Sequence, residues 1–195
     1  MTSKIANIQI LKPLLEDFLK QIHKKSKCTS LAIRLQQEGD FPYCLYTGFP
    51  EFFVQKENTI AKRNQKNEII TDAKGEPILE CMCGNIIRRR FNPKYPYFTK
   101  EGAFWTNSTT QLLESFTEQE KQEIGNTRNT CHDYGYESVA LIPIHANDEI
   151  IGLIQLNDQV ENMFTPEKIA EYQVLADHIG KIILDITQFY EKIAN

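Results

Sequence analysis

The sequence predicts an α+β domain: a central antiparallel sheet with the terminal helices on one face and an irregular middle segment on the other. Two observations support this fold class. Apolar residues recur at helical spacing near both ends of the chain, and between these ends they alternate at strand spacing. We expect a single domain over residues 1–195. It would contain a helix at about 12–25, a core at about 28–160 and a long final helix at about 166–194.

The N-terminal part predicts a helix followed by a β-hairpin. Apolar residues form one helical stripe with Pro13 in the first turn, and then "SLAIRLQQ" alternates as in a half-buried strand. The segment "QEGDFP" supplies the turn to a second strand, "YCLYTGF". The stripe consists of Ile8, Leu11, Leu15, Phe18 and Ile22, and the strand alternates Leu31, Ile33 and Leu35 with Ala32, Arg34 and Gln36.

The middle, from Pro50 to Tyr136, is long and irregular, which is typical of a segment that builds a binding pocket or lid. A small hairpin is expected with Lys74-Gly75 at its tip. Capping-box spacing predicts two short helices, one starting at Ser108 with Gln111 and the other at Thr117 with Glu120. A further helix or turn is expected to begin near Glu80.

Regular structure returns with "ESVALIPIHANDEIIGLIQLND", which predicts a hairpin near the centre of the sheet. Pro143 cannot donate a backbone hydrogen bond and therefore indicates an edge or a bulge. Thr165 caps the final helix, and Pro166 occupies its first position. This helix carries two apolar stripes, so we expect it to pack on the sheet and also to meet another helix. The predicted homodimer interface consists of Leu11, Leu15, Phe18, Ile179, Ile183, Ile186 and Tyr190.

Composition excludes several classes of protein. The 22 basic and 26 acidic residues give a net charge of −4, and the short Arg88–Arg90 run has no basic partner stretch, so we expect no nucleic-acid binding. The sequence contains neither a signal peptide nor an apolar run long enough to span a membrane, which predicts a cytoplasmic protein. In that compartment thiols stay reduced, so the five cysteines are not expected to form a disulfide framework.

The order of elements, together with "GFPEFFV", "ILECMCGNII", "FWTNSTTQLL", "TRNTCHDYGYESVALIPI" and "IIGLIQLND", resembles GAF domains, the small-molecule sensor modules of signalling proteins. It is similar to a cysteine-containing group of these domains in bacterial and archaeal sensor histidine kinases. In that group cysteines recur at the positions of Cys28, Cys81, Cys83 and Cys131, but not at that of Cys44. No kinase core follows Phe189, so the chain is an excised piece or a free-standing module; the opening at Met1 favours a complete small protein.

The cysteines leave several roles open: packing residues, a redox pair, or ligands of zinc or an iron–sulfur cluster. Four thiolates suit such a metal site, yet Cys81 and Cys83 are one residue apart, and in a helix they would lie about 200° apart. A helix there predicts that only one of the two approaches Cys131. Haem is implied by the resemblance, with His132, His145 or a cysteine as the axial ligand. The cofactor is therefore left unassigned.

The expected function is that of a non-catalytic sensor that binds a small molecule or detects redox state and signals through its terminal helices in a dimer. A histidine kinase or another signalling protein is the implied partner. The candidate ligand-binding residues are Phe104, Trp105, Asn107, Arg128, Tyr134 and Tyr136, with Arg34 and Arg128 able to neutralise an anion. Because some GAF relatives reduce methionine sulfoxide with pocket cysteines, a small thiol redox enzyme is the alternative; Cys131-His132 alone does not form a nucleophile–base pair.

Overall fold

The computed structural model describes residues 8–194, and the backbone only at Ala194. The predicted N-terminal and C-terminal ends of the domain, residues 1–7 and 195, lie outside this range. The helices are α1 (Ile8–Ser26), α2 (Glu51–Glu57), α3 (Cys81–Ile87), α4 (Thr109–Ser115), α5 (Glu118–Ile124), α6 (Thr130–Asp133) and α7 (Pro166–Ala194). The strands are β1 (Ser30–Leu35), β2 (Tyr43–Thr47), β3 (Phe104–Thr106), β4 (Ser138–Ala146) and β5 (Glu149–Asp158).

The five strands form one antiparallel sheet in the order β2-β1-β5-β4-β3, which confirms the predicted fold class. The β4–β5 hairpin turns at Ala146 and Glu149, and β5 is the central strand. Pro143 lies on β4 beyond the three residues that pair with β3, next to a register shift between Ile144 and His145. Both expectations for this proline, an edge and a bulge, are therefore met.

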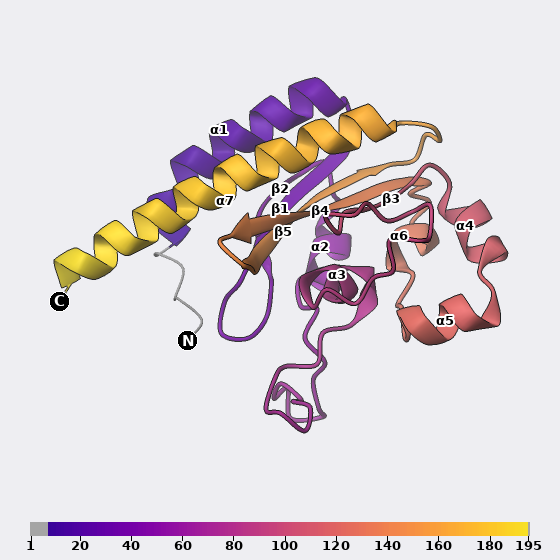
Figure 1. The fold of residues 1–195 in the computed structure, drawn as a ribbon, viewed down its shortest axis with the longest axis horizontal. Helices are drawn as coiled ribbons and strands as arrows, with labels where there is room; N and C mark the ends of the chain where they lie inside the picture. The colour runs from indigo at the N-terminus through magenta and orange to yellow at the C-terminus, as the bar shows by residue number, and fades with distance from the viewer. Residues whose placement is uncertain (1–7, 195) are drawn as a thin grey trace.

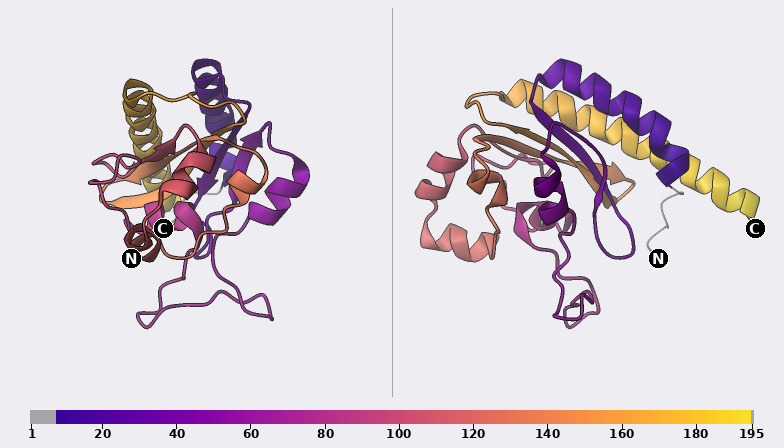
Figure 2. Two further views of the ribbon diagram at one scale, coloured as in Figure 1. Left: turned by 90° about the vertical axis from the view of Figure 1, so that its right-hand side faces the viewer. Right: turned by 180° about the vertical axis from the view of Figure 1, so that it is seen from behind.

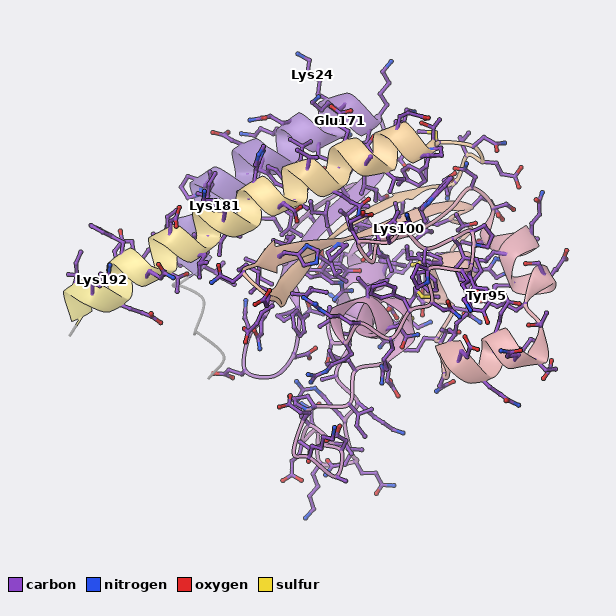
Figure 3. The ribbon with its side chains drawn as sticks, viewed as in Figure 1. Lys24, Tyr95, Lys100, Glu171, Lys181 and Lys192 are labelled. Carbon is purple, nitrogen blue, oxygen red and sulfur yellow. The ribbon has the colours of Figure 1, made fainter. Side chains whose placement is uncertain are left out.

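Helices α1 and α7 lie side by side on one face of the sheet, and α2 and α3 lie on the other (Figure 1 and Figure 2). Lys25, at the end of α1, forms an ion pair with Glu171, near the start of α7, so the two helices run antiparallel. Figure 3 labels Glu171 near the start of α7. Between α2 and α3 the chain projects away from the body as an arm, residues 60–79, visible at the bottom of Figure 1.

Capping and turn residues in the sequence predicted the positions of several elements correctly. Ser108 accepts a hydrogen bond from the Gln111 backbone N–H, and Thr117 forms a complete capping box with Glu120. Thr165 caps α7 in the same way, through the backbone N–H of Lys168. In the arm, isolated bridges such as Thr71–Pro77 flank the predicted tip.

Two predictions about the N-terminal half were wrong. Helix α1 begins at Ile8, so Pro13 lies inside the helix rather than in its first turn. Strand β1 is buried along its whole length rather than on one face, because the middle segment covers the second face. Leu31, Ile33 and Leu35 face the terminal helices, whereas Ala32 belongs to the core on the other side.

The predicted dimer residues divide into two groups. Leu11, Leu15, Ile179 and Ile183 are buried in the core between the terminal helices and the sheet, so packing within one chain accounts for them. Phe18 and Ile186 are partly buried against the same core, and Tyr190 is exposed. The last turns of α7, near Lys192 in Figure 3, extend past the sheet. The exposed apolar residues of α7 are Val174, Ile182, Phe189, Tyr190 and Ile193.

Candidate functional site

An apolar cavity of about 80 Å³ lies between the sheet and the middle segment. Three cysteines from two separate segments line it: Cys81 and Cys83 from α3, and Cys131 from α6. Phe104, Val139 and Leu141 of the sheet form its floor, and Leu112, Leu113 and Phe116 close it from the α4 side. The cavity thus combines an apolar lining with a cluster of thiols.

The start of α3 brings both cysteines of the "CMC" segment to this cavity. Gly84 allows α3 to pack closely against Leu79, the residue before its N-cap, since an added Cβ would lie 2.7 Å from the Leu79 carbonyl carbon. Cys81, the first residue of the helix, has a φ of 65°, in the left-handed region. The helical-wheel argument that separated Cys81 from Cys83 is therefore wrong, because Cys81 does not have helical backbone geometry.

Cys131 and His132 both line the cavity but have different partners. The Cys131 thiol accepts a hydrogen bond from the Gln155 side-chain amide, with the nitrogen 3.7 Å from the sulfur. The hydroxyl of Thr109 donates to the Tyr136 carbonyl at 2.8 Å, so His132 Nδ1 donates to that hydroxyl at 3.2 Å. The imidazole therefore orients α6 against α4 and does not pair with the adjacent thiol.

Burial controls the acidity of the deeper thiols. Burial raises the pKa of Cys83 to about 12, and the nearby Cys81 and Glu57 add to the increase while Arg34 opposes it. Burial likewise raises the pKa of Cys131 well above the ordinary thiol value, with Cys83 and Cys81 contributing. Both groups are therefore protonated at neutral pH, and a thiol is a much weaker nucleophile than a thiolate.

Arg34 has a structural role rather than the anion-binding role considered for it. It is 1% exposed, and its guanidinium stacks on the Tyr43 ring at 3.5 Å from the ring centre. Its N–H groups donate to the backbone carbonyls of Phe41, Asn58 and Glu57. Most of its donors are therefore used to fix the C-terminal end of α2 to the sheet.

Arg128 lies closer to the cavity thiols. Its Nη2 is 3.2 Å from Glu57 Oε2 and donates to the Thr59 carbonyl at 3.0 Å. The guanidinium is also within hydrogen-bonding reach of the Cys81 thiol. Burial disfavours its charge, but Glu57 and then the thiols of Cys81 and Cys83 outweigh burial and raise the pKa of Arg128.

Cys28 does not join the other three cysteines. It is completely buried in the core between the terminal helices and the sheet, on the opposite face from the cavity. Burial raises its pKa to about 11. The sheet therefore excludes a four-thiolate site in this conformation, and no group of three or more His, Cys, Asp or Glu side chains within residues 8–194 is arranged to hold a metal ion. Cys44 lies on β2 and donates to the Ile33 carbonyl.

Of the aromatic candidates, Phe104 lines the cavity, but its neighbour Trp105 faces the opposite side of the sheet, as alternation along a strand requires. Asn107 pairs with the backbone of Phe164 through both its side-chain oxygen and nitrogen and so fixes the segment before α7. Tyr134 and Tyr136 pack on the α2 phenylalanines. The cavity lining therefore includes Phe104 but none of the other four candidates, Trp105, Asn107, Tyr134 and Tyr136.

The cavity does not fit haem in this conformation. Ligand pockets for molecules of drug size enclose roughly 300–1,000 Å³, whereas this cavity encloses about 80 Å³. Of the proposed axial ligands, His132 is at the cavity, but His145 pairs with Asp177 of α7 at 2.9 Å on the helix-covered side. The space suits a few atoms, such as a small molecule or an oxygen added to a thiol.

Sequence reasoning missed two polar residues beside the thiols, Glu57 and Asn157. The periodicity of the sequence around each residue indicates that it is buried. Glu57 follows Phe53 and Val54 at helical spacing, which places it on the buried face of α2. Asn157 alternates with Leu153 and Gln155 along β5, so all three face the middle segment.

Comparison with known proteins shows which family part of the chain is similar to. The GAF domain family model matches residues 102–183, from just before β3 into the second half of α7. This match and the architecture confirm the predicted GAF-like fold. No curated protein matches the sequence significantly.

Solved structures share the fold at low sequence identity. A domain from a protein described as a two-component sensor histidine kinase of Sinorhizobium meliloti 1021 is 12% identical, covers 93% of this chain and 97% of its own, and has a TM-score of 0.59. The PixJ GAF domain of Thermosynechococcus elongatus is 10% identical with coverages of 98% and 95% and a TM-score of 0.58. The type II free methionine-R-sulfoxide reductase of Thermoplasma acidophilum is 11% identical, with coverages of 91% and 95% and a TM-score of 0.54.

None of the described helices is both long and apolar enough to cross a bilayer.

Proposed function

We propose that this chain is a non-catalytic regulatory GAF module that detects a small molecule or the redox state of its thiols and signals through α1 and α7. One observation carries the proposal: three cysteines from two separate segments of the chain line one small apolar cavity against the sheet. The resemblance to sensor domains supports the same class of function. A cytoplasmic location, where thiols are reduced until an oxidant arrives, fits this role.

Strand β4 provides a direct route from the cavity to the helices. Val139 and Leu141 contact the cavity from one face of the strand. Ala140, Ile142 and Ile144 alternate with them and belong to the core beneath the terminal helices. A change of packing in the cavity would therefore shift residues directly adjacent to those that support α7.

A homodimer would carry the signal to a histidine kinase or another signalling partner. Its interface would lie on the exposed part of α7, because Ile182, Phe189 and Ile193 are exposed while the sheet-facing stripe is buried. A second copy supplies a matching apolar surface of the same length and shape. The proposed dimer interface is therefore formed by the C-terminal turns of α7.

The test measures hydrogen exchange of the reduced chain before and after treatment with peroxide. We expect changed amide protection in β4 and α7 in the wild type. The same response is expected in Cys44→Ser, whose thiol lies outside the cavity, but not in a chain with Cys81, Cys83 and Cys131 replaced by Ser. Oxidised cavity thiols with unchanged protection in both terminal helices would refute the signalling role.

A thiol redox enzyme is the competing proposal, since the same three cysteines would have to turn over methionine sulfoxide. The raised pKa of Cys83 and of Cys131 argues against either of these two thiols as the attacking nucleophile at neutral pH. An assay of free methionine sulfoxide with a thiol reductant separates the two roles. Multiple turnovers per chain would establish the enzyme, whereas a regulatory module yields none above the buffer rate.

A further inference from the structure

A charged cluster lies next to the three thiols and is not part of the cavity lining. Arg34, Glu57 and Arg128 form it: Arg34 donates to the Glu57 carbonyl at 2.6 Å, and Arg128 approaches the Glu57 carboxylate at 3.2 Å. Glu57 is 5% exposed. Two guanidinium groups and one carboxylate leave a net charge of +1, so the cluster favours an additional group that carries negative charge or accepts hydrogen bonds.

Three buried polar atoms in this region have no hydrogen-bond partner among the described residues: Glu57 Oε1, Arg128 Nε and Asn157 Nδ2. Native proteins satisfy roughly 90% or more of such buried groups, since each unpaired one costs about 1–3 kcal/mol. Glu57 Oε1 is an acceptor, and the other two atoms are donors. The cluster therefore presents both kinds of group to a small polar guest.

The side chain best placed to receive that guest is Cys81. Its thiol is within reach of the Arg128 guanidinium, and it lines the cavity while remaining partly exposed. Cys83, by contrast, is buried. A left-handed φ at a residue other than glycine costs of order 1–3 kcal/mol and persists only where the surroundings hold it. Cys81 has this conformation at the start of α3, where it lines the cavity.

We propose that Cys81 is the thiol that a peroxide oxidises first, and that Arg128 and Glu57 hold the resulting sulfenic acid. This proposal rests on the proposed function and specifies its redox form. The Cys81 sulfur supplies an electron pair to one peroxide oxygen, so an S–O bond forms and the O–O bond breaks. The other oxygen leaves as hydroxide and takes up the proton released by the thiol, which gives water.

A sulfenic acid supplies partners for two of the three unpaired atoms. Its oxygen accepts from Arg128 Nε–H, and its O–H donates to Glu57 Oε1, so one added oxygen pairs two buried groups at once. Arg128 also stabilises the negative charge that develops on the departing oxygen. Arg128 and Glu57 are positioning residues in this reaction, and Cys81 is the reacting group.

The experiment treats the fully reduced chain with hydrogen peroxide in the presence of dimedone, which alkylates sulfenic acids, and maps the adducts by mass spectrometry. We expect Cys81 to carry most of the early label. Arg128→Met should slow labelling by about tenfold, because the guanidinium would no longer stabilise the negative charge that develops on the departing oxygen. Arg88→Met is the matched control, since Arg88 pairs with the exposed Glu76 in the arm. In this variant, Cys81 should be labelled at the same rate as in the wild type.

Glu57→Gln provides a second measurement if Arg128→Met fails to fold, and circular dichroism establishes whether each variant folds. Delayed addition of dimedone gives the lifetime of the sulfenic acid, which should shorten several-fold in Glu57→Gln. Early label on Cys83, Cys131 or Cys44 in the wild type would overturn the proposal, whatever the variants do. Equal rates in Arg128→Met and the wild type would also overturn it.

The two proposals fail in different ways. Label on Cys81 without any change of amide protection in α7 supports the sulfenic acid site and removes the signalling role. A change in α7 that follows first oxidation of Cys131 retains the signalling role and removes the assignment to Cys81.

Discussion

Gly180 of α7 lies directly against the backbone carbonyl of His145 on β4: a Cβ added to Gly180 would come within 1.9 Å of that oxygen. No side chain can occupy this position unless the helix moves away from the sheet. The close approach sets the distance between α7 and the strand that also forms the floor of the cavity.

Gly180→Ala should therefore destabilise the domain. In an open helix position this substitution would stabilise by up to about 1 kcal/mol, so the sign of the effect is diagnostic. We expect a loss of roughly 1–3 kcal/mol, typical of overpacking, in the free energy of unfolding by urea. His178→Ala on the exposed side of the same helix is the control and should change stability little. A stabilising Gly180→Ala would mean that α7 does not approach β4 this closely.

The exposed end of α7 predicts self-association. Phe189→Glu combined with Ile193→Glu should convert a dimer into a folded monomer in sedimentation velocity, because both side chains are exposed in the single chain. Ile183→Glu is the contrasting variant. It would place a charge in the core and unfold the domain rather than only separate two copies. A wild-type chain that stays monomeric at high concentration would exclude the dimer.

Asp40 anchors the arm to the β1–β2 turn. Its carboxylate accepts from the backbone N–H groups of Phe41, Ile60 and Ala61 and from the Thr59 hydroxyl. Asp40→Ala leaves these buried donors unpaired, at a cost of about 1–3 kcal/mol. We expect faster trypsin cleavage within the exposed residues 62–68 of the arm, where the wild type should also be cut first. Initial cleavage of both proteins in the β4–β5 hairpin would contradict this assignment.

The same carboxylate predicts a response to acid. Burial alone would raise the pKa of Asp40, but the hydrogen bonds from Thr59 and the backbone outweigh burial and lower this pKa below the ordinary value for an aspartate. A depressed folded-state pKa contributes stability that is complete above the unfolded value and is lost as the pH falls through the folded value. Cleavage of the wild-type arm by pepsin should therefore accelerate below about pH 4. Asp40→Asn should lack this step, and an identical acid response in both proteins would refute the cause.

Cys28 is expected to report global unfolding. It is completely buried, and burial raises its pKa to about 11, so it should resist alkylation at neutral pH. Its labelling rate in increasing urea should follow the loss of far-ultraviolet circular dichroism. Labelling of Cys28 before that transition would indicate that α1 or α7 opens locally from the sheet.

Local and periodic signals predicted much of the fold. The capping residues Ser108, Thr117 and Thr165 placed three helix starts, and the alternation in "VALIPI" and "IIGLIQL" placed the central hairpin. These features depend on neighbours in the sequence, so a single sequence is sufficient to recognise them. The short elements α2, α6 and β3 were missed because their stability comes from distant packing rather than from local pattern.

The arrangement of the candidate site could not be predicted from the sequence, because it depends on contacts between residues that are distant in the chain. Cys28 and Cys81 were grouped by residue type, yet the sheet separates them. The left-handed backbone of Cys81 follows from its tertiary surroundings, and so the expected helix geometry failed at that residue. Arg34 followed the alternation of an exposed strand position but is buried, because the end of α2 receives its guanidinium.

The alternation of β5 implies that the central strand tolerates substitution far better than a change in length. Ile154 and Leu156 support the helices, while Leu153, Gln155 and Asn157 face the middle segment. Deleting one residue within the strand would exchange these faces over the rest of its length, turning amides toward α7 and aliphatic groups toward the thiols. Related sequences should therefore accumulate insertions and deletions in the arm and leave the spacing between Gly152 and Asp158 constant.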